Sequence, residues 1–233
     1  ISQVLFGETF EIIEKDKERS WIRLTFDGYE GHIDNKQFVK ISEDNFLKLK
    51  NEKNYFSGEI IDFITNEKNE LTTIPLGSRL PSYNNCKLQI NSNTFSYQGT
   101  FLSEKKSKKE IAQTAFTYLN TPFLWGGKTP FGIDCSGLTQ MVYKLCGHAL
   151  LRDAKEQATQ GEVLSFIEES EPGDLAFFDN DEGEIIHTGI VLENNYIIHC
   201  NGRVRIDRID SSGIYNVDTK RHTHKLRVMK QLF

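Results

Sequence analysis

The stretch that most constrains this chain is a cysteine placed between a glycine-rich segment and an amphipathic helix. Cys135 stands in the sequence Asp-Cys-Ser-Gly at residues 134–137, shortly after Trp125 and two glycines. Apolar residues then recur at helical spacing at Leu138, Met141, Val142 and Leu145. A helix that begins at Cys135 favours the thiolate through its N–H groups and dipole. Cys135 is therefore a candidate nucleophile, although a lone cysteine at such a place is usually a small buried apolar residue.

Two β-rich runs downstream each carry a histidine. Residues 185–192 contain His187, residues 196–200 contain His199, and the Glu-Asn-Asn between them predicts a hairpin turn. Strand positions two apart share a face, so any loop of odd length makes the two imidazoles close neighbours on one face. An even loop without a bulge would separate them. With a cysteine at a helix start, this arrangement favours a Cys–His–His constellation over two structural histidines.

Composition and charge exclude several functions. The net charge is −5 with a pI near 5.7, and no basic stripe appears, so we expect neither a nucleic-acid nor a membrane partner. The four cysteines, Cys86, Cys135, Cys146 and Cys200, lack paired CxxC spacing. We therefore expect no zinc site.

The sequence gives limited information on compartment. It has no apolar run of transmembrane length and no signal-peptide pattern. The sparse cysteines suit a reducing compartment, so we expect a cytoplasmic monomer. A periplasmic or secreted protein stays open, because the chain begins at Ile1 and a signal could precede it.

The first hundred residues predict small all-β domains. Residues 1–42 predict five short strands, with Asp27-Gly28 as a hairpin turn, and we expect them to form a small SH3-like barrel with a shortened first strand. These strands lie at residues 4–6, 9–13, 21–26, 31–33 and 38–40. Residues 43–104 predict a second barrel of the same SH3-like kind. Its strands lie at residues 58–64, 71–75, 87–90 and 94–97.

Residues 105–233 predict an α+β domain in which helices precede an antiparallel sheet. A helical stripe begins at Ile111, the helix of Cys135 follows, and a third helix begins at Asp153, where Asp-x-x-Glu forms a capping box. After a turn at residues 171–174, strands are predicted at residues 175–178, 185–192, 196–200, 204–206 and 225–229. Cys135 on a helix end would then face His187 on the sheet.

Three motifs resemble those of the NlpC-type cell-wall peptidases, the papain-like cysteine hydrolases of bacterial murein. They are Thr-Pro-Phe-Leu-Trp-Gly-Gly at 121–127 with Gly-Ile-Asp-Cys-Ser-Gly at 132–137, Pro-Gly-Asp-Leu at 172–175, and His-Thr-Gly-Ile at 187–190 with Ile-His at 198–199. The resemblance covers residues 105–233. The preceding barrels resemble the bacterial SH3 modules of members that cut γ-D-glutamyl–L-diamino acid bonds.

The resemblance implies roles for single residues. Cys135 matches the nucleophile, His187 the general base, and His199 the polar residue that orients this base. Further positions match substrate-binding residues: Asp134 and Ser136, which flank the nucleophile and hold the free α-amine of the substrate; Glu8 and Tyr29, which complete that amine pocket from the first barrel; Trp125 in the glycine-rich segment; and Arg152 and Asp153, which face the diamino acid. Helix capping alone also explains Asp153.

The resemblance implies a cysteine endopeptidase acting on murein peptides with a free N-terminal L-alanine, in cell-wall recycling. The reaction that this resemblance implies needs no metal and no organic cofactor. One departure is Phe123, where the family usually has a tyrosine whose hydroxyl supports the oxyanion. Two alternatives follow: a murein-peptide-binding module with little or no activity, and an amidase or acyltransferase on the same scaffold. A metal hydrolase built on His222 and His224 is the weakest alternative, because that pair lacks further ligands.

Overall fold

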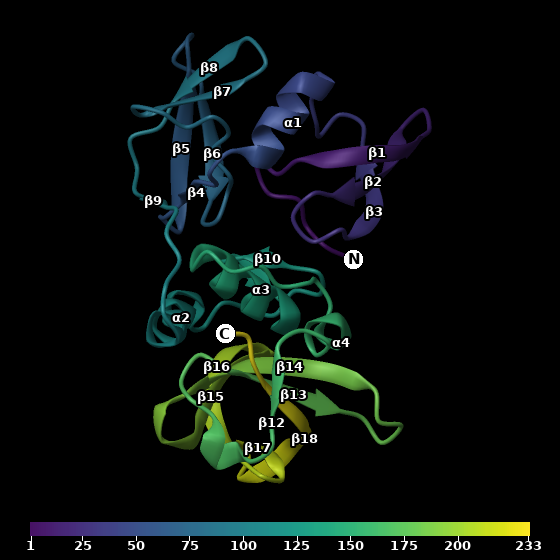
Figure 1. The fold of residues 1–233 in the computed structure, drawn as a ribbon, viewed down its shortest axis with the longest axis vertical. Helices are drawn as coiled ribbons and strands as arrows, with labels where there is room; N and C mark the ends of the chain where they lie inside the picture. Colours follow the sequence, from purple (N-terminus) through teal and green to yellow (C-terminus); the bar gives the residue numbers. More distant parts are fainter. The chain divides into compact units, whose positions relative to one another are not determined.

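The structure is a computed structural model that describes residues 1–233, and the chain forms two compact units (Figure 1). The first comprises residues 1 and 3–103, and the second comprises residues 2 and 104–233. The boundary lies one residue from the expected start of the catalytic domain at residue 105. No helix combines the length and the apolar character needed to cross a membrane.

The first unit opens with a three-stranded antiparallel sheet, β1(Phe10–Lys15), β2(Arg19–Leu24) and β3(Glu30–Asp34). The turn at Asp27 and Gly28 joins β2 to β3, as the sequence predicts. The strands predicted at residues 4–6 and 38–40 are wrong. Leu5 instead begins a tight turn that the Glu8 carboxylate closes, by accepting the Leu5 N–H at 2.8 Å. Phe38 packs edge-on against Phe10 without pairing as a strand.

Helix α1(Glu43–Asn51) lies where the sequence analysis expected only β structure. Ser42 caps it by accepting the Asn45 N–H. Acidic residues occupy its first turn and lysines its last, which complements the helix dipole. The cap and the charge pattern were present in the sequence. The helix was missed because its apolar stripe is short, with Leu49 as its only buried residue.

The rest of the first unit contains a four-stranded sheet and a two-stranded one. The sheet order is β6(Leu71–Pro75), β5(Ile61–Asn66), β8(Asn93–Ser96) and β7(Lys87–Ile90), and β4(Phe56–Ser57) pairs with β9(Phe101–Leu102). The apolar core of this part of the first unit consists of Ile64, Ile74, Leu80, Leu88 and Tyr97. All four predicted strands are present, but ladder hydrogen bonds do not join the two sheets into a closed barrel. The second SH3-like barrel is therefore not confirmed.

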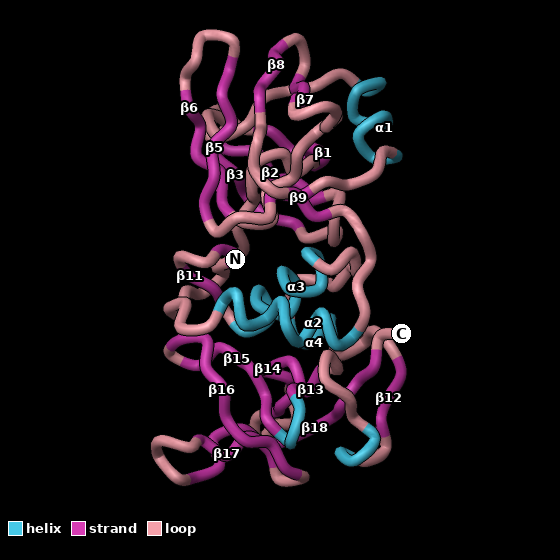
Figure 2. The backbone as a smooth tube through the Cα atoms, turned by 90° about the vertical axis from the view of Figure 1, so that its left-hand side faces the viewer, coloured by secondary structure: helices cyan, strands magenta, loops and turns pink.

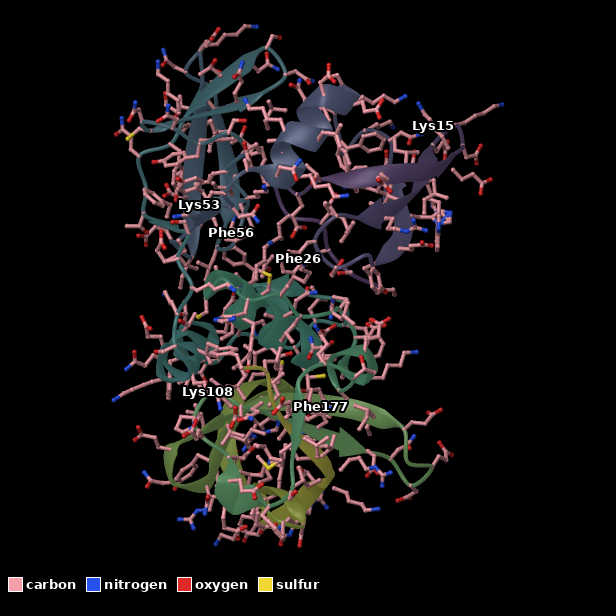
Figure 3. The ribbon with its side chains drawn as sticks, in the orientation of Figure 1. Lys15, Phe26, Lys53, Phe56, Lys108 and Phe177 are labelled. Carbon is pink, nitrogen blue, oxygen red and sulfur yellow. The ribbon has the colours of Figure 1, made fainter.

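The second unit begins with helices, as the sequence predicts. They are α2(Lys108–Ala115), the 3₁₀ turn η1(Phe116–Tyr118), α3(Cys135–Leu145) and α4(Ala154–Gln157), with the hairpin β10(Lys128–Thr129) and β11(Gly132–Ile133) before α3. The capping box of Asp153 and Glu156 is confirmed, but α4 is a single turn. Figure 3 labels Lys108, whose ammonium lies 2.9 Å from the Asp174 carboxylate and ties α2 to the turn before the sheet.

The strands of the second unit close into a six-stranded antiparallel barrel. They are β13(Leu175–Asp179), β14(Ile185–Leu192), β15(Tyr196–Asn201), β16(Arg203–Asp210), β17(Gly213–Asn216) and β18(Arg221–Gln231), and β12(Glu162–Leu164) adds to β18. Short 3₁₀ turns, η2(Ile167–Glu169) and η3(Glu193–Asn195), complete the unit. Figure 1 shows the ring that the strands make, and Figure 2 shows the same strands in magenta from the side. The antiparallel sheet is thus confirmed, but its closure was not predicted, because β17 was missed.

Closure depends on the long strand β18. It pairs with β13 along one edge, while its first residues pair with β17. Register shifts in both ladders bend it. Apolar side chains fill the barrel: Ala176, Phe178, Val191, Ile197, Ile209, Ile214 and Met229. Helix α3 packs against β14 and β15, and this contact brings the start of α3 to the sheet.

Candidate active site

Helix α3 begins at Cys135, as the sequence predicts, because Asp134 caps it. One Asp134 carboxylate oxygen accepts the Gly137 N–H at 2.6 Å, and the other accepts the Gly126 N–H at 2.7 Å. The same carboxylate therefore fixes both the helix and the glycine-rich segment before it. Gly137 is required by this packing, since a Cβ there would lie 2.2 Å from the Gly127 carbonyl oxygen.

The Cys135 thiol is partly exposed but is not a thiolate at rest. Burial raises its pKa to about 11, and the adjacent Asp134 carboxylate adds to this rise. The backbone N–H groups of Thr188 and Ser136 act in the opposite direction but do not outweigh these effects. The expectation that the helix start alone would favour the thiolate is wrong, because burial of the thiol, together with the charge of the Asp134 carboxylate, outweighs the helix dipole. Cys135 needs a base to remove its proton.

The hairpin of β14 and β15 brings the two histidines together as predicted. Its three-residue loop pairs Leu192 with Tyr196, and Gly189 lies opposite His199. The His187 Nε2 and His199 Nδ1 atoms are 2.8 Å apart, and the ring planes are nearly perpendicular, at 88°. Both side chains are buried, at 6% and 0% exposure.

His187 is connected to the Cys135 thiol through its neighbour in β14, Thr188. The N–H of its neighbour Thr188 interacts with the Cys135 sulfur, and α3 packs on β14. Burial lowers the pKa of His187 well below its ordinary value, and the neighbouring imidazoles of His199 and His224 lower it further. The imidazole is therefore neutral and has a lone pair to accept a proton.

Asp207 of β16 extends this arrangement, and the sequence analysis missed it. Its carboxylate accepts from the His199 Nε2 at 3.0 Å and from the Arg205 Nε at 2.6 Å. His199 lies two residues from the barrel residue Ile197, and Asp207 lies two from Ile209, so all four face the barrel interior. The Asn-Gly turn signal at residues 201–202 could have revealed Asp207, by extending the hairpin register one strand further.

His224 is a second residue that sequence reasoning missed. Its ring stacks on that of His187, with centroids 4.2 Å apart and planes 25° from parallel. Burial lowers the pKa of His224 to about 4, so it is neutral beside the base at ordinary pH. The sequence places His224 only in a close pair with His222, the basis of the metal-hydrolase alternative. The structure contains no group of three or more His, Cys, Asp or Glu side chains arranged to hold a metal ion.

The residues predicted to bind substrate around Cys135 form a buried ion pair. The Arg152 guanidinium lies 3.0 and 2.7 Å from the two Asp134 carboxylate oxygens and donates to the Ser136 hydroxyl at 2.9 Å. Arg152 is only 1% exposed. Asp153 caps α4. The geometry thus gives Asp134, Ser136 and Arg152 a structural task, and their role in substrate binding stays a prediction.

The remaining predicted residues lie in two places. Trp125 is 70% exposed, in the segment that approaches Cys135, and Phe123 nearby is 42% exposed. Glu8 and Tyr29 are half-buried in the first unit, where Glu8 closes the turn at Leu5 and the Tyr29 N–H donates to Asp27. Their role in an amine pocket stays a prediction.

Two family models match parts of the chain. Residues 120–225 match the NlpC/P60 family, and residues 1–38 match the bacterial dipeptidyl-peptidase SH3 domain. The chain is 36% identical over 98 residues to a γ-D-glutamyl-L-lysine dipeptidyl-peptidase of Bacillus subtilis, covering 41% of this chain and 33% of that protein. It is 25% identical over 232 residues to the protein of the same name from Bacillus cereus, covering 85% and 66%. The matched part spans a third to two thirds of these relatives.

Solved structures share the fold. An NlpC/P60 family protein from Bacillus cereus superposes with a TM-score of 0.81 at 21% identity, covering 99% of this chain and 81% of that one. An NlpC/P60 endopeptidase from Photobacterium damselae superposes with a TM-score of 0.72 at 18% identity, covering 100% and 65%.

Proposed function

Because the chain carries an NlpC/P60 domain and a bacterial SH3 domain, we propose that it is a cysteine endopeptidase of murein peptides. The bond cleaved is the γ-D-glutamyl–L-diamino acid bond of peptides with a free N-terminal L-alanine. The observation that carries this proposal is the contact chain from the start of α3 to His187, His199 and Asp207. The names of the two Bacillus relatives support the choice of bond.

The first step is a proton transfer coupled to attack. The Cys135 thiol gives its proton to the free ring nitrogen of His187, and the sulfur lone pair forms a bond to the γ-carbonyl carbon. The carbonyl π electrons move to oxygen, giving an oxyanion. Because the thiol has a raised pKa and the imidazole a lowered one, both groups are neutral until substrate arrives.

The second step releases the amine. As the oxyanion collapses, the carbon–nitrogen bond breaks, and the diamino acid leaves with the proton that His187 holds. Water then attacks the thioester, losing a proton to His187, and the thiol is restored as L-Ala-D-Glu departs. No cofactor takes part in this scheme.

The oxyanion needs donors at the start of α3. The Cys135 backbone N–H is free of helical bonds, because it belongs to the first residue of the helix. Phe123 supplies no hydroxyl. Losing one such donor costs roughly a hundredfold in rate, so we propose a slower enzyme that performs the same reaction.

We propose that the enzyme selects its substrates by the free α-amine of their N-terminal L-alanine. We propose that Asp134 and Ser136 bind the L-alanine ammonium, because a desolvated ammonium needs carboxylate and hydroxyl acceptors. For Glu8 and Tyr29 we propose an amine-binding role on the family resemblance alone. Asp153 would meet the diamino acid, Trp125 would cover the peptide, and Arg152, which binds Asp134 and Ser136, would hold that pair in place. Residues 43–104 would act as a second SH3-like module. A requirement for a free amine suits a monomeric enzyme that recycles murein peptides in the cytoplasm.

Peptide cleavage tests the function. The protein is incubated with L-Ala-γ-D-Glu-L-lysine, with the diaminopimelate equivalent, and with each peptide N-acetylated. We expect release of the free diamino acid from the unblocked peptides only, and no release by Cys135→Ala. No cleavage by protein whose Cys135 remains alkylatable would overturn the proposal.

The same assay separates the alternatives. Tight peptide binding without turnover would favour a binding module. Transfer of the L-Ala-D-Glu acyl group to an added amine instead of water would favour an acyltransferase.

A further inference from the structure

Asp207 is a buried carboxylate whose two oxygens each accept two hydrogen bonds. One oxygen accepts from the His199 Nε2 at 3.0 Å and the Arg205 Nε at 2.6 Å. The other accepts from an Arg205 Nη at 2.9 Å and the Val217 N–H at 3.0 Å. Its side chain is fully buried. Hydrogen bonds from His199 and Arg205 hold the pKa of Asp207 well below its usual range despite burial, so it only accepts.

An acceptor at Nε2 decides the tautomer of His199. That nitrogen must carry the hydrogen, and burial lowers the pKa of His199 even though Asp207 raises it. His199 is therefore neutral, and its Nδ1 holds a lone pair. The His187 Nε2, 2.8 Å away, must then be the donor. A neutral His187 with hydrogen on Nε2 has its lone pair on Nδ1.

We propose that Asp207 is a positioning residue that fixes the tautomers of His199 and His187, so that the His187 Nδ1 is the atom that takes the Cys135 proton. This assignment rests on the proposed role of His187 as general base. When Nδ1 takes the proton, the donor chain through His199 to Asp207 is unchanged and stabilises the new positive charge.

Arg205 holds Asp207 in place for this task. It binds both carboxylate oxygens from the same strand and is itself held by Asp218 at 2.8 Å. Its positive charge also offsets that of the carboxylate, and it lowers the pKa of His199. Without this guanidinium, the negative charge of Asp207 would raise the pKa of His199 and favour its protonated form.

Asp207→Asn should reverse the direction of the hydrogen bonds that link residue 207, His199 and His187, with little change in side-chain shape. One oxygen of Asp207 meets two donors that cannot reverse, from Arg205 and Val217. The other meets one fixed donor and the reversible His199 nitrogen. The amide NH₂ of asparagine therefore faces His199 and donates to its Nε2. His199 then carries hydrogen on Nδ1, His187 becomes the acceptor at Nε2, and its Nδ1 is already protonated.

The same strand offers a matched control. Asp210 also accepts from a histidine, at 2.9 Å from the His222 Nε2, but this pair is exposed, at 53% and 44% of the two side chains. Asp210→Asn makes the same chemical change on β16 away from the site.

The experiment measures tautomers, thiol reactivity and turnover in the full chain. Long-range ¹⁵N–¹H NMR of the unmodified protein should show His187 and His199 with hydrogen on Nε2, and Asp207→Asn should move both to Nδ1. The rate of Cys135 alkylation by iodoacetamide at neutral pH should fall. With the murein peptide, kcat should fall about 10³- to 10⁴-fold with KM within about twofold, and Asp210→Asn should change none of these.

Two results would overturn the assignment: hydrogen on the His187 Nδ1 in the unmodified protein, or an Asp207→Asn variant that keeps its alkylation rate. The first needs no variant, so it stands even if Asp207→Asn does not fold. Neither needs substrate. An uncleaved peptide with the expected tautomers would defeat the proposed reaction and leave the role of Asp207 intact.

Discussion

Strand β16 contributes the aspartate to two histidine–aspartate pairs of the same chemistry, and their histidines lie on β15 and β18. The inner pair, His199 and Asp207, is fully buried and joined by Arg205. The outer pair, His222 and Asp210, is about half exposed. The nitrogen–oxygen distances are nearly equal, at 3.0 and 2.9 Å. The nitrogen–oxygen distance therefore does not distinguish a functional pair here. What distinguishes the inner pair is its burial and the hydrogen bond between His199 and the imidazole of His187.

Removing the carboxylate from each pair should give the largest contrast. Asp207→Ala leaves the buried His199 Nε2–H and the Val217 N–H without their acceptor and leaves Arg205 with Asp218 alone, so the free energy of unfolding of the second unit should fall by about 3–5 kcal/mol. Asp210→Ala should cost about 0–1 kcal/mol, as for other exposed ion pairs. Calorimetry of both variants measures the contrast. Equal losses would mean that burial is not what distinguishes the pairs.

A hydroxyl restored near the nucleophile should change the rate strongly. Phe123→Tyr supplies the oxyanion donor that this chain lacks, so kcat for the murein peptide should rise by up to about a hundredfold. Phe131→Tyr is the control, because Phe131 is also exposed and lies in the same segment before α3. An equal response of the two variants would show that the position of the hydroxyl does not matter.

Acid should destabilise the inner cluster. Burial lowers the pKa values of His187, His199 and His224, the last to about 4. Below about pH 6.5 the unfolded chain binds protons that the folded chain does not, so stability is full above that pH and falls as the pH drops. Each such histidine contributes about 1.4 kcal/mol per pH unit.

His224→Phe tests this effect, because it keeps a ring against His187 and removes one titrating group. The loss of stability per pH unit between pH 6.5 and 4 should become shallower by up to about 1.4 kcal/mol. Thermal unfolding followed by Trp125 fluorescence in a Trp21→Phe background would report on the second unit. An unchanged slope would show that His224 does not resist protonation.

The smallest effect is expected at the outer histidine. His222→Gln changes an exposed side chain on the barrel surface, so the free energy of unfolding should stay within about 0.5 kcal/mol and kcat should not change. Measurable loss of turnover would connect the outer pair to the site and remove the contrast between the two.

The sequence predicted the local parts of the site well. The apolar spacing after Cys135 located α3, and the odd loop between two β-rich runs made His187 and His199 neighbours. Both depend on residues close together in the chain. The charge state of Cys135 was not predictable from the helix start, because it depends on burial and on the second use of Asp134 as a cap.

Long-range pairing explains what was missed. Asp207 and His224 reach the site only because β16 and β18 belong to a closed barrel, and closure depends on β17, a short strand with little apolar pattern. The strands expected at residues 4–6 and 38–40 failed for a related reason. Leu5 and Phe38 pack as side chains, but neither segment has a neighbouring strand to pair with.

The central claim is that Cys135, activated by His187, forms an acyl-enzyme with the murein peptide. Rapid acid quenching followed by mass spectrometry of the digested protein tests it directly. We expect an L-Ala-D-Glu acyl group on the peptide that contains Cys135, appearing before the steady state and lost on further incubation. Turnover by protein whose Cys135 has been fully alkylated, or an acyl group on a different residue, would contradict the account.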